Sequence, residues 1–163
     1  MIVVSNASPL IAISKLKLFS HWPALYESVI IPDAVFKEVV MKGAGRPGAA
    51  ELTKGVASGF IVRQQAKNSL AVSALSEFFG AGESEAIVLA SEIVADTVIL
   101  DDNKARIVAD SMGLHVMGTI GILLDMKQCK VIPKIKPFLD SAIRFGFRIA
   151  PDLYVKILRV AGE

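Results

Sequence analysis

The sequence is poor in cysteine and histidine, with one and two of them in 163 residues. A single cysteine, Cys129, excludes an intrachain disulfide framework and a cysteine-ligated metal cluster. Two histidines, His21 and His115, are too few for a histidine-rich zinc site. We therefore expect a protein of the reducing cytoplasm that uses neither disulfides nor zinc.

Long hydrophobic runs and a strong charge imbalance are also missing. No stretch reaches the roughly 18 apolar residues that span a bilayer, and the first apolar run has no basic residues before it. The chain carries 18 Lys and Arg against 16 Asp and Glu, a net charge of +2. This balance permits contact with nucleic acid but does not argue for it. Aromatic residues, at 7%, are not interleaved with the basic cluster around Lys127–Lys136, so no base-stacking platform is expected there. We expect no membrane association.

What the sequence does contain is a regular alternation of short apolar runs and helical patterns. Hydrophobic residues make up 53% of the chain, enough for one core at this length. Strands are expected at residues 2–4, 28–31, 60–63, 97–100 and 114–117. Helices are expected at residues 9–17, 18–25, 33–40, 49–59, 70–79, 86–94, 105–112, 122–129, 135–145 and 151–161. This alternation predicts an α/β fold, a three-layer α/β/α sandwich around a central parallel sheet of four to five strands. We expect a single domain over residues 1–163, whose last helices, from about residue 133, form a carboxy-terminal extension.

Polar residues stop two of the expected strands abruptly. The first strand ends at Asn6, and the fourth ends at Asp101 and Asp102. Ligands of parallel α/β sheets gather at the carboxyl ends of strands, and two adjacent carboxylates there repel each other unless a cation relieves them. Alternatively, Asn6 is a turn residue, Asp101 caps the following helix and Asp102 is solvated.

Three glutamates could complete an acidic cluster. Glu83 and Glu85 lie near the start of an apolar helix, and Glu38 lies within an earlier one. Each has a plain explanation in the helix dipole or a solvated helix face. Together with the strand-end acids, however, they suit Mg²⁺ or Mn²⁺, as found in nucleases. Because Glu83 and Glu85 are about 200° apart around a helix, we expect one to face the acids and the other to face water.

Several motifs in this order resemble the PIN domain, the fold of VapC-type toxin ribonucleases. The matching segments run nearly end to end: VVSNASPLIAISKL, IPDAVFKEV, GAGESEAIVLA, VILDDNKAR and GLHVMGTIGILL. The GTIGILL segment and the FGFRIAPDLYVKIL tail resemble one mostly uncharacterised branch of PIN proteins. The resemblance implies an Mg²⁺- or Mn²⁺-dependent endoribonuclease acting on RNA, as in the toxin of a toxin–antitoxin pair. It also implies a small antitoxin-like protein partner and a homodimer.

The resemblance also assigns a site. Its catalytic positions match Asp101, Glu83, Glu38 and Asn6, and its metal ligands match Asp101, Glu83 and Asn6, with Asp102 close by. Asn6 stands where PIN ribonucleases normally place their first metal-binding Asp. An amide keeps one carbonyl oxygen but loses a charge, so metal affinity should fall. The alternative function is therefore a catalytically weak PIN-like module that binds RNA or protein.

Four further residues are candidates for binding substrate. Ser8 could contact the metal-bound water or the substrate, although its alternative role is to cap the first long helix. Thr119 could be a polar contact near the site or the cap of the helix after Gly118. Lys104 and Arg106 could meet phosphates, or could simply belong to a solvated helix face.

Overall fold

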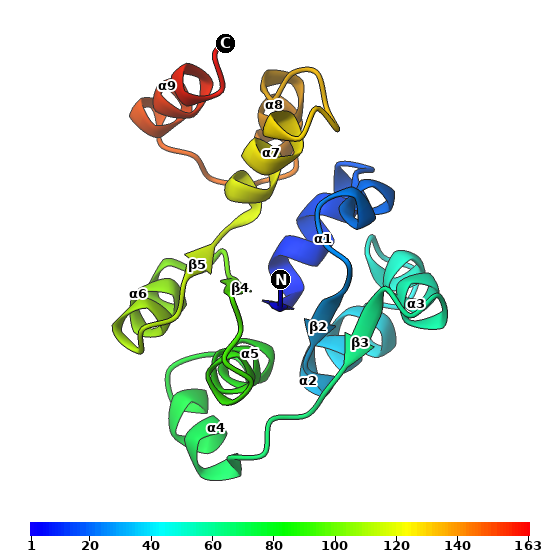
Figure 1. The fold of residues 1–163 in the computed structure, drawn as a ribbon, viewed down its shortest axis with the longest axis vertical. Coiled ribbons are helices and arrows are strands. Elements are labelled where there is room, and N and C mark those ends of the chain that lie inside the picture. Colours follow the sequence, from blue (N-terminus) through cyan, green and yellow to red (C-terminus); the bar gives the residue numbers. More distant parts are fainter.

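The computed structural model describes all residues, 1–163. Its five strands form one sheet in the order β3-β2-β1-β4-β5, and every neighbouring pair is parallel. The strands are short: β1 (Val3–Ser5), β2 (Val29–Ile31), β3 (Ile61–Arg63), β4 (Thr97–Ile99) and β5 (Val116–Met117). The expected parallel sheet is confirmed, and Figure 1 shows it crossing the middle of the molecule.

Helical segments connect the strands. They are α1 (Ala7–Lys15), η1 (Phe19–Ala24), α2 (Asp33–Phe36), η2 (Lys37–Lys42), α3 (Ala49–Ala57), α4 (Ser69–Ser76), α5 (Ala81–Glu92), α6 (Asn103–Ser111), α7 (Thr119–Gln128), α8 (Lys136–Arg144) and α9 (Pro151–Val160). Two of the differences from the sequence-based expectation concern the candidate glutamates. The helix expected at 33–40 continues from α2 into a π-helical turn, η2, which carries Glu38. The helix α5 begins five residues earlier than expected, so Glu83 lies in its first turn.

Each face of the sheet packs against its own layer of helices. Residues alternate along the strands, so Val3 and Ile99 join one hydrophobic cluster while Val4 and Val98 join another. The first cluster lies beneath α1, α3 and α7, and the second beneath α5 and α6. This arrangement confirms the three-layer α/β/α sandwich.

The carboxy-terminal helices pack onto the first of these clusters. Ile135, Leu139 and Ala142 of the α8 region and Ile157 of α9 are buried in the same cluster as α1. The carboxylate of Glu163 accepts hydrogen bonds from the backbone N–H groups of Ile135 (2.6 Å) and Lys136 (3.2 Å). Figure 1 shows α7, α8 and α9 together at one end of the molecule. None of the helices is both long and apolar enough to cross a bilayer.

Candidate functional site

The first and fourth strands bring Asn6 and Asp101 to one edge of the sheet. The strands β1 and β4 are parallel neighbours, and the backbone N–H of Asn6 donates to the carbonyl of Ile99 (3.1 Å). The Asn6 side chain is buried, and its Oδ1 accepts a hydrogen bond from the N–H of Ala7, which makes Asn6 the N-cap of α1. The capping alternative for Ser8 is therefore wrong: Ser8 lies inside the first turn with an exposed side chain.

Glu83 reaches Asn6 from the first turn of α5. The Nδ2 atom of Asn6 donates to Oε1 of Glu83 across 3.3 Å. Burial raises the pKa of the Glu83 carboxyl, and the negative charges of Asp102 and Glu38 raise it further, while N–H groups of Gly80 and Asn6 partly oppose the shift. Glu83 is therefore a partly buried acid that faces two other acids.

Glu38 approaches the same place from η2, and Gly82 makes room for it. A Cβ atom on Gly82 would lie 3.0 Å from Oε2 of Glu38 and 3.6 Å from Oδ1 of Asn6. Gly82 itself is buried. The lack of a side chain there lets Glu38 and Asn6 meet the start of α5, a role that was missed from the sequence because an isolated glycine in a helix has many explanations.

Asp101 is held by Thr119, the first residue of α7. Its Oδ1 accepts from the Thr119 backbone N–H (2.7 Å), and its Oδ2 accepts from the Thr119 hydroxyl (2.6 Å). Burial nevertheless raises the pKa of Asp101, although these two donors and the charge of Arg106 oppose it. Arg106 lies close by, since a Cβ on Gly118 would sit 2.6 Å from its Nη1 and 3.0 Å from Oδ1 of Asp101.

Asp102 and Lys104 face the solvent side of this edge. Asp102 is the N-cap of α6, and its Oδ1 accepts from the N–H of Ala105 (2.8 Å). The alternative that Asp101 caps this helix is therefore wrong; Asp102 does so. Lys104 is exposed, and its side chain makes neither a hydrogen bond nor an ion pair.

Glu85 points away from the acids, into the interior. Its carboxylate accepts from the N–H of Ala34 in α2 (3.1 Å) and from the N–H of Ala66 (3.3 Å), and only 8% of the residue is exposed. The expectation that the second glutamate faces water is wrong, because Glu85 ties α5 to two other segments. Of the two alternatives, Glu83 is the one that meets Asn6.

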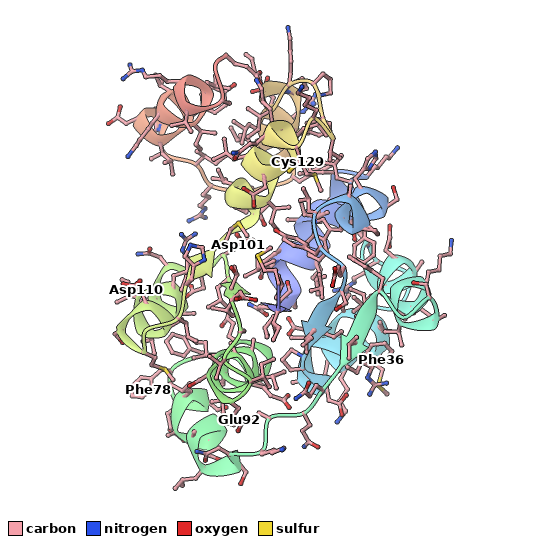
Figure 2. The ribbon with its side chains drawn as sticks, in the orientation of Figure 1. Phe36, Phe78, Glu92, Asp101, Asp110 and Cys129 are labelled. Atoms are coloured by element: carbon pink, nitrogen blue, oxygen red, sulfur yellow. The ribbon has the colours of Figure 1, made fainter.

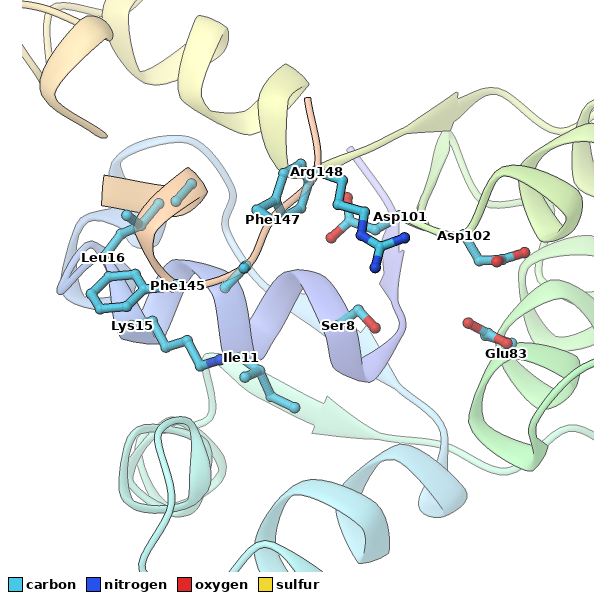
Figure 3. Close-up of a pocket in the computed structure, with 13 residues that line it drawn as sticks. Ser8, Ile11, Lys15, Leu16, Glu83, Asp101, Asp102, Phe145, Phe147 and Arg148 are labelled. Atoms are coloured by element: carbon cyan, nitrogen blue, oxygen red, sulfur yellow. The ribbon is translucent and has the colours of Figure 1, made fainter. Parts of the chain in front are cut away.

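A pocket of about 540 Å³ opens beside these side chains. Figure 3 shows Asp101, Asp102 and Glu83 at one end of it, with Ser8 on α1 between them and the rest of the pocket. Four further lining residues were not singled out from the sequence, namely Lys15, Phe145, Phe147 and Arg148. The signal in the sequence for the last three is the FGFR segment, residues 145–148, in which two phenylalanines flank a glycine and an arginine follows. Figure 2 places Asp101 near the centre of the molecule, far from the exposed Phe78 at its rim.

The oxygen-rich side chains at this edge match the ligand preference of Mg²⁺ and Mn²⁺. Burial, and after it the charges of neighbouring acids, raises the pKa of Glu83 because both disfavour its charged form. A divalent cation would stabilise that charged form. The donor chemistry therefore fits such an ion. No three acids lie close enough together to hold such an ion in this arrangement. Thr119 engages both oxygens of Asp101, and the Asn6 amide donates to Glu83.

Comparison with known proteins agrees with the fold. The family model described as DUF3368: PIN domain matches residues 2–163, almost the entire chain. Among curated proteins, none matches. The parallel five-stranded sheet with helices on both faces is the architecture that the family match leads one to expect. On the strength of the family match, the chain belongs to the PIN-domain family DUF3368.

Proposed function

We propose that this protein is a weak, divalent-metal-dependent endoribonuclease of the PIN class. The observation that carries the proposal is the hydrogen bond between Asn6 and Glu83 at the carboxyl edge of a parallel sheet, where the charges of Asp102 and Glu38 also act on Glu83. PIN domains have a nuclease-type fold and generally depend on divalent metals. The open pocket beside the acids gives a substrate access to them.

The residues that would hold Mg²⁺ or Mn²⁺ are Glu83, Asp101, Asp102 and the amide of Asn6. Glu38 lies close enough for its charge to raise the pKa of Glu83. When bound, such an ion lowers the pKa of a water molecule and balances charge on a phosphate. Burial raises the pKa of Glu83 above its ordinary value, which makes this carboxyl a better proton acceptor than an exposed glutamate. Thr119 positions Asp101 rather than substrate, because its hydroxyl is already committed to that carboxylate.

Basic and hydroxyl groups around the acids would meet the RNA. The exposed hydroxyl of Ser8 faces the pocket and is free to donate to a phosphate oxygen. Arg106 lies beside Asp101 and balances part of its charge. Lys104, exposed on α6, supplies positive charge at the rim.

The test is cleavage of a fluorescent single-stranded RNA with Mg²⁺, with Mn²⁺ and with EDTA. We expect slow cleavage that EDTA abolishes and that Glu83→Gln reduces at least tenfold. Glu77→Gln, which changes an exposed glutamate outside the pocket, is the matched control. Cleavage that persists unchanged in EDTA or in Glu83→Gln would show that a contaminant or another site is responsible.

A second candidate function is a catalytically weak module that binds RNA or protein. It is favoured by one observation: Asn6 donates a hydrogen bond to Glu83 at the position where the family resemblance expects a metal-binding Asp. No cleavage by the wild-type chain, together with binding of the same RNA, would favour this candidate.

The partners in the proposal are RNA, a small antitoxin-like protein and a second copy of the chain, in the cytoplasm. The family membership supports RNA as the ligand, and the single exposed Cys129 suits a reducing compartment. Light scattering of the purified protein tests the homodimer, and mass spectrometry of small proteins that co-purify with it tests the partner protein.

A further inference from the structure

We propose that the pocket between α1 and residues 145–148 is a subsite for one nucleotide of single-stranded RNA. Its base stacks on Phe145, and the phosphates on either side of it are held by Arg148 and Lys15. The inference rests on the proposed function, since the same pocket opens onto Asp101, Asp102 and Glu83.

The two walls of the pocket come from segments far apart in the sequence. One wall is a face of α1, on which Ser8, Ile11 and Lys15 follow one another at helical spacing. The other wall is the turn after α8, where Gly146 adopts a positive φ of 93° that carries the chain back across α1. The volume between them, about 540 Å³, is within the usual range of about 300–1,000 Å³ for small-ligand sites.

Phe145 offers an aromatic face that the fold does not use. It is 53% exposed and lies outside both hydrophobic clusters, whereas Phe147, two residues on, packs partly against the core. The half-buried Ile11 lines the same pocket. An exposed aromatic ring beside cations is the usual platform for a base of a single strand, because every base has a π-face.

Arg148 and Lys15 supply positive charge that the chain leaves unpaired. They are the two basic residues that line the pocket. Neither forms an ion pair, since the ion pairs of the structure are Arg63–Asp33, Lys127–Glu163 and Lys136–Asp140. In Figure 3 Arg148 points toward the end lined by Asp101 and Ser8, while Lys15 lies beside Phe145 at the other end.

This arrangement orders the contacts along the strand. The phosphate at the Arg148 end lies next to the acids and would be the one that is cleaved. The base on Phe145 belongs to the neighbouring nucleotide, and Lys15 meets the next phosphate. The subsite therefore favours flexible single strands over duplex RNA, whose bases are stacked on one another and unavailable to the ring.

Binding is tested with a 5′-fluorescein 2′-O-methyl hexanucleotide, followed by anisotropy in Mg²⁺ and in EDTA, with gel analysis to verify that it stays intact. We expect Phe145→Ala to weaken binding about tenfold and Phe145→Trp to restore it. We expect Arg148→Ala and Lys15→Ala each to reduce the slope of log K against log salt by about 0.7, the contribution of one phosphate contact to a single strand. Phe78→Ala and Arg159→Ala, exposed residues outside the pocket, are the matched controls.

The outcomes separate this subsite from the nuclease proposal. The subsite is overturned if the wild type does not bind the oligonucleotide, if Phe145→Ala binds as tightly as wild type, or if the controls weaken binding equally. Reduced binding in the pocket variants supports the subsite even when the protein cleaves no RNA. The absence of cleavage contradicts only the nuclease proposal. Metal-dependent cleavage with unchanged binding in all pocket variants supports the nuclease and removes the subsite.

Discussion

The amide of Asn6 joins the end of β1 to the start of α5, because its Nδ2 donates to Oε1 of Glu83 across 3.3 Å. Its Oδ1 is meanwhile committed to the N–H of Ala7 as the cap of α1. An aspartate could do the second task but not the first, since an ionised carboxylate only accepts hydrogen bonds. Asn6 thus holds Glu83 without the cation that a pair of carboxylates would require.

Asn6→Asp should therefore lower the stability of the metal-free protein and raise its affinity for metal. Two carboxylates would replace the amide–carboxylate contact, which raises the pKa of Glu83 further and lowers the metal-free melting temperature. We expect a loss of about 1–2 kcal/mol in the free energy of unfolding without metal, and a similar gain in Mn²⁺ binding. Melting curves with and without Mn²⁺, calorimetric titration and cleavage of a fluorescent RNA measure the three effects.

Asn6→Ser is the control for the charge that Asn6→Asp adds. Serine keeps a side-chain oxygen that can cap α1 but adds no charge, so Mn²⁺ binding should not increase. If Asn6→Asp binds Mn²⁺ no better than wild type and cleaves RNA no faster, then Asn6 is only a turn and cap residue. The RNA- or protein-binding module would then be the better description of the protein.

Glu83→Gln and Glu85→Gln should have opposite effects although the residues are two apart. A glutamine at 83 can still accept the Asn6 hydrogen bond and removes a charge that burial and neighbouring acids disfavour, so metal-free stability should be kept or slightly raised while Mn²⁺ binding weakens. A glutamine at 85 leaves the N–H of Ala34 or Ala66 facing a donor, which should cost about 1–3 kcal/mol of unfolding free energy.

Urea unfolding and calorimetric Mn²⁺ titration of both variants distinguish these roles. The assignment of Glu83 to the site fails if both variants bind Mn²⁺ like wild type. The structural role of Glu85 fails if its variant unfolds at the same urea concentration as the wild type.

Much of this architecture could be read from the sequence because it depends on periodicity. Short apolar runs separated by helical patterns specify a parallel sheet, and polar residues directly after two of those runs specify the edge where Asn6 and Asp101 lie. Side-chain partners were harder to foresee. Spacing predicts that Glu83 and Glu85 point in different directions. It cannot say that Glu85 accepts from the backbone N–H groups of Ala34 and Ala66 rather than facing water.

Tertiary contacts account for the other differences. The pairing of Asp101 with Thr119 joins residues 18 apart through the start of a second helix, and no local pattern encodes it. Phe145 and Arg148 line the same pocket as the acids only because α8 and the turn after it pack against α1. The π-helical turn at Glu38 likewise has no signature in the sequence.

The stability of the metal-free protein should contain a component that falls as pH rises. The pKa values of Glu83 and Asp101 are both raised by burial above the ordinary values of 4.5 and 3.8. The folded state therefore holds more protons than the unfolded state in this window. This contribution is fully present below the unfolded-state pKa values, near pH 4, and is lost as pH rises through the raised ones.

Glu83→Gln isolates this component, because the lowered pKa values of groups such as Asp140 act in the opposite sense on the total. Urea unfolding of both proteins without metal between about pH 4 and pH 7.5 is the measurement. The unfolding free energy of wild type minus that of the variant should decrease as pH rises. With Mn²⁺ present the difference should increase instead, since the ion binds the deprotonated acid. A difference that does not change with pH in metal-free buffer contradicts the raised pKa of Glu83.

Thr119→Val should destabilise the protein most at neutral pH. Valine has nearly the shape of threonine and keeps the backbone N–H that donates to Oδ1 of Asp101, but it removes the hydroxyl that donates to Oδ2. Thr119 is 1% exposed, so water cannot readily replace the lost donor. A hydrogen bond to a buried carboxylate contributes about 1.5–3 kcal/mol, and we expect a loss of this size in unfolding free energy at pH 7.5.

The pH dependence of that loss identifies its cause. Losing the hydroxyl donor raises the pKa of Asp101 above its already raised value, so the variant takes up its proton at higher pH than the wild type. As pH falls and both proteins carry a neutral Asp101, the difference between them should shrink. Thr119→Ser, which keeps the hydroxyl, should lie within about 1 kcal/mol of wild type at every pH. A constant penalty for Thr119→Val from pH 5 to pH 7.5 would instead assign the effect to packing around α7, and Asp101 would not be the group that Thr119 holds in its charged form.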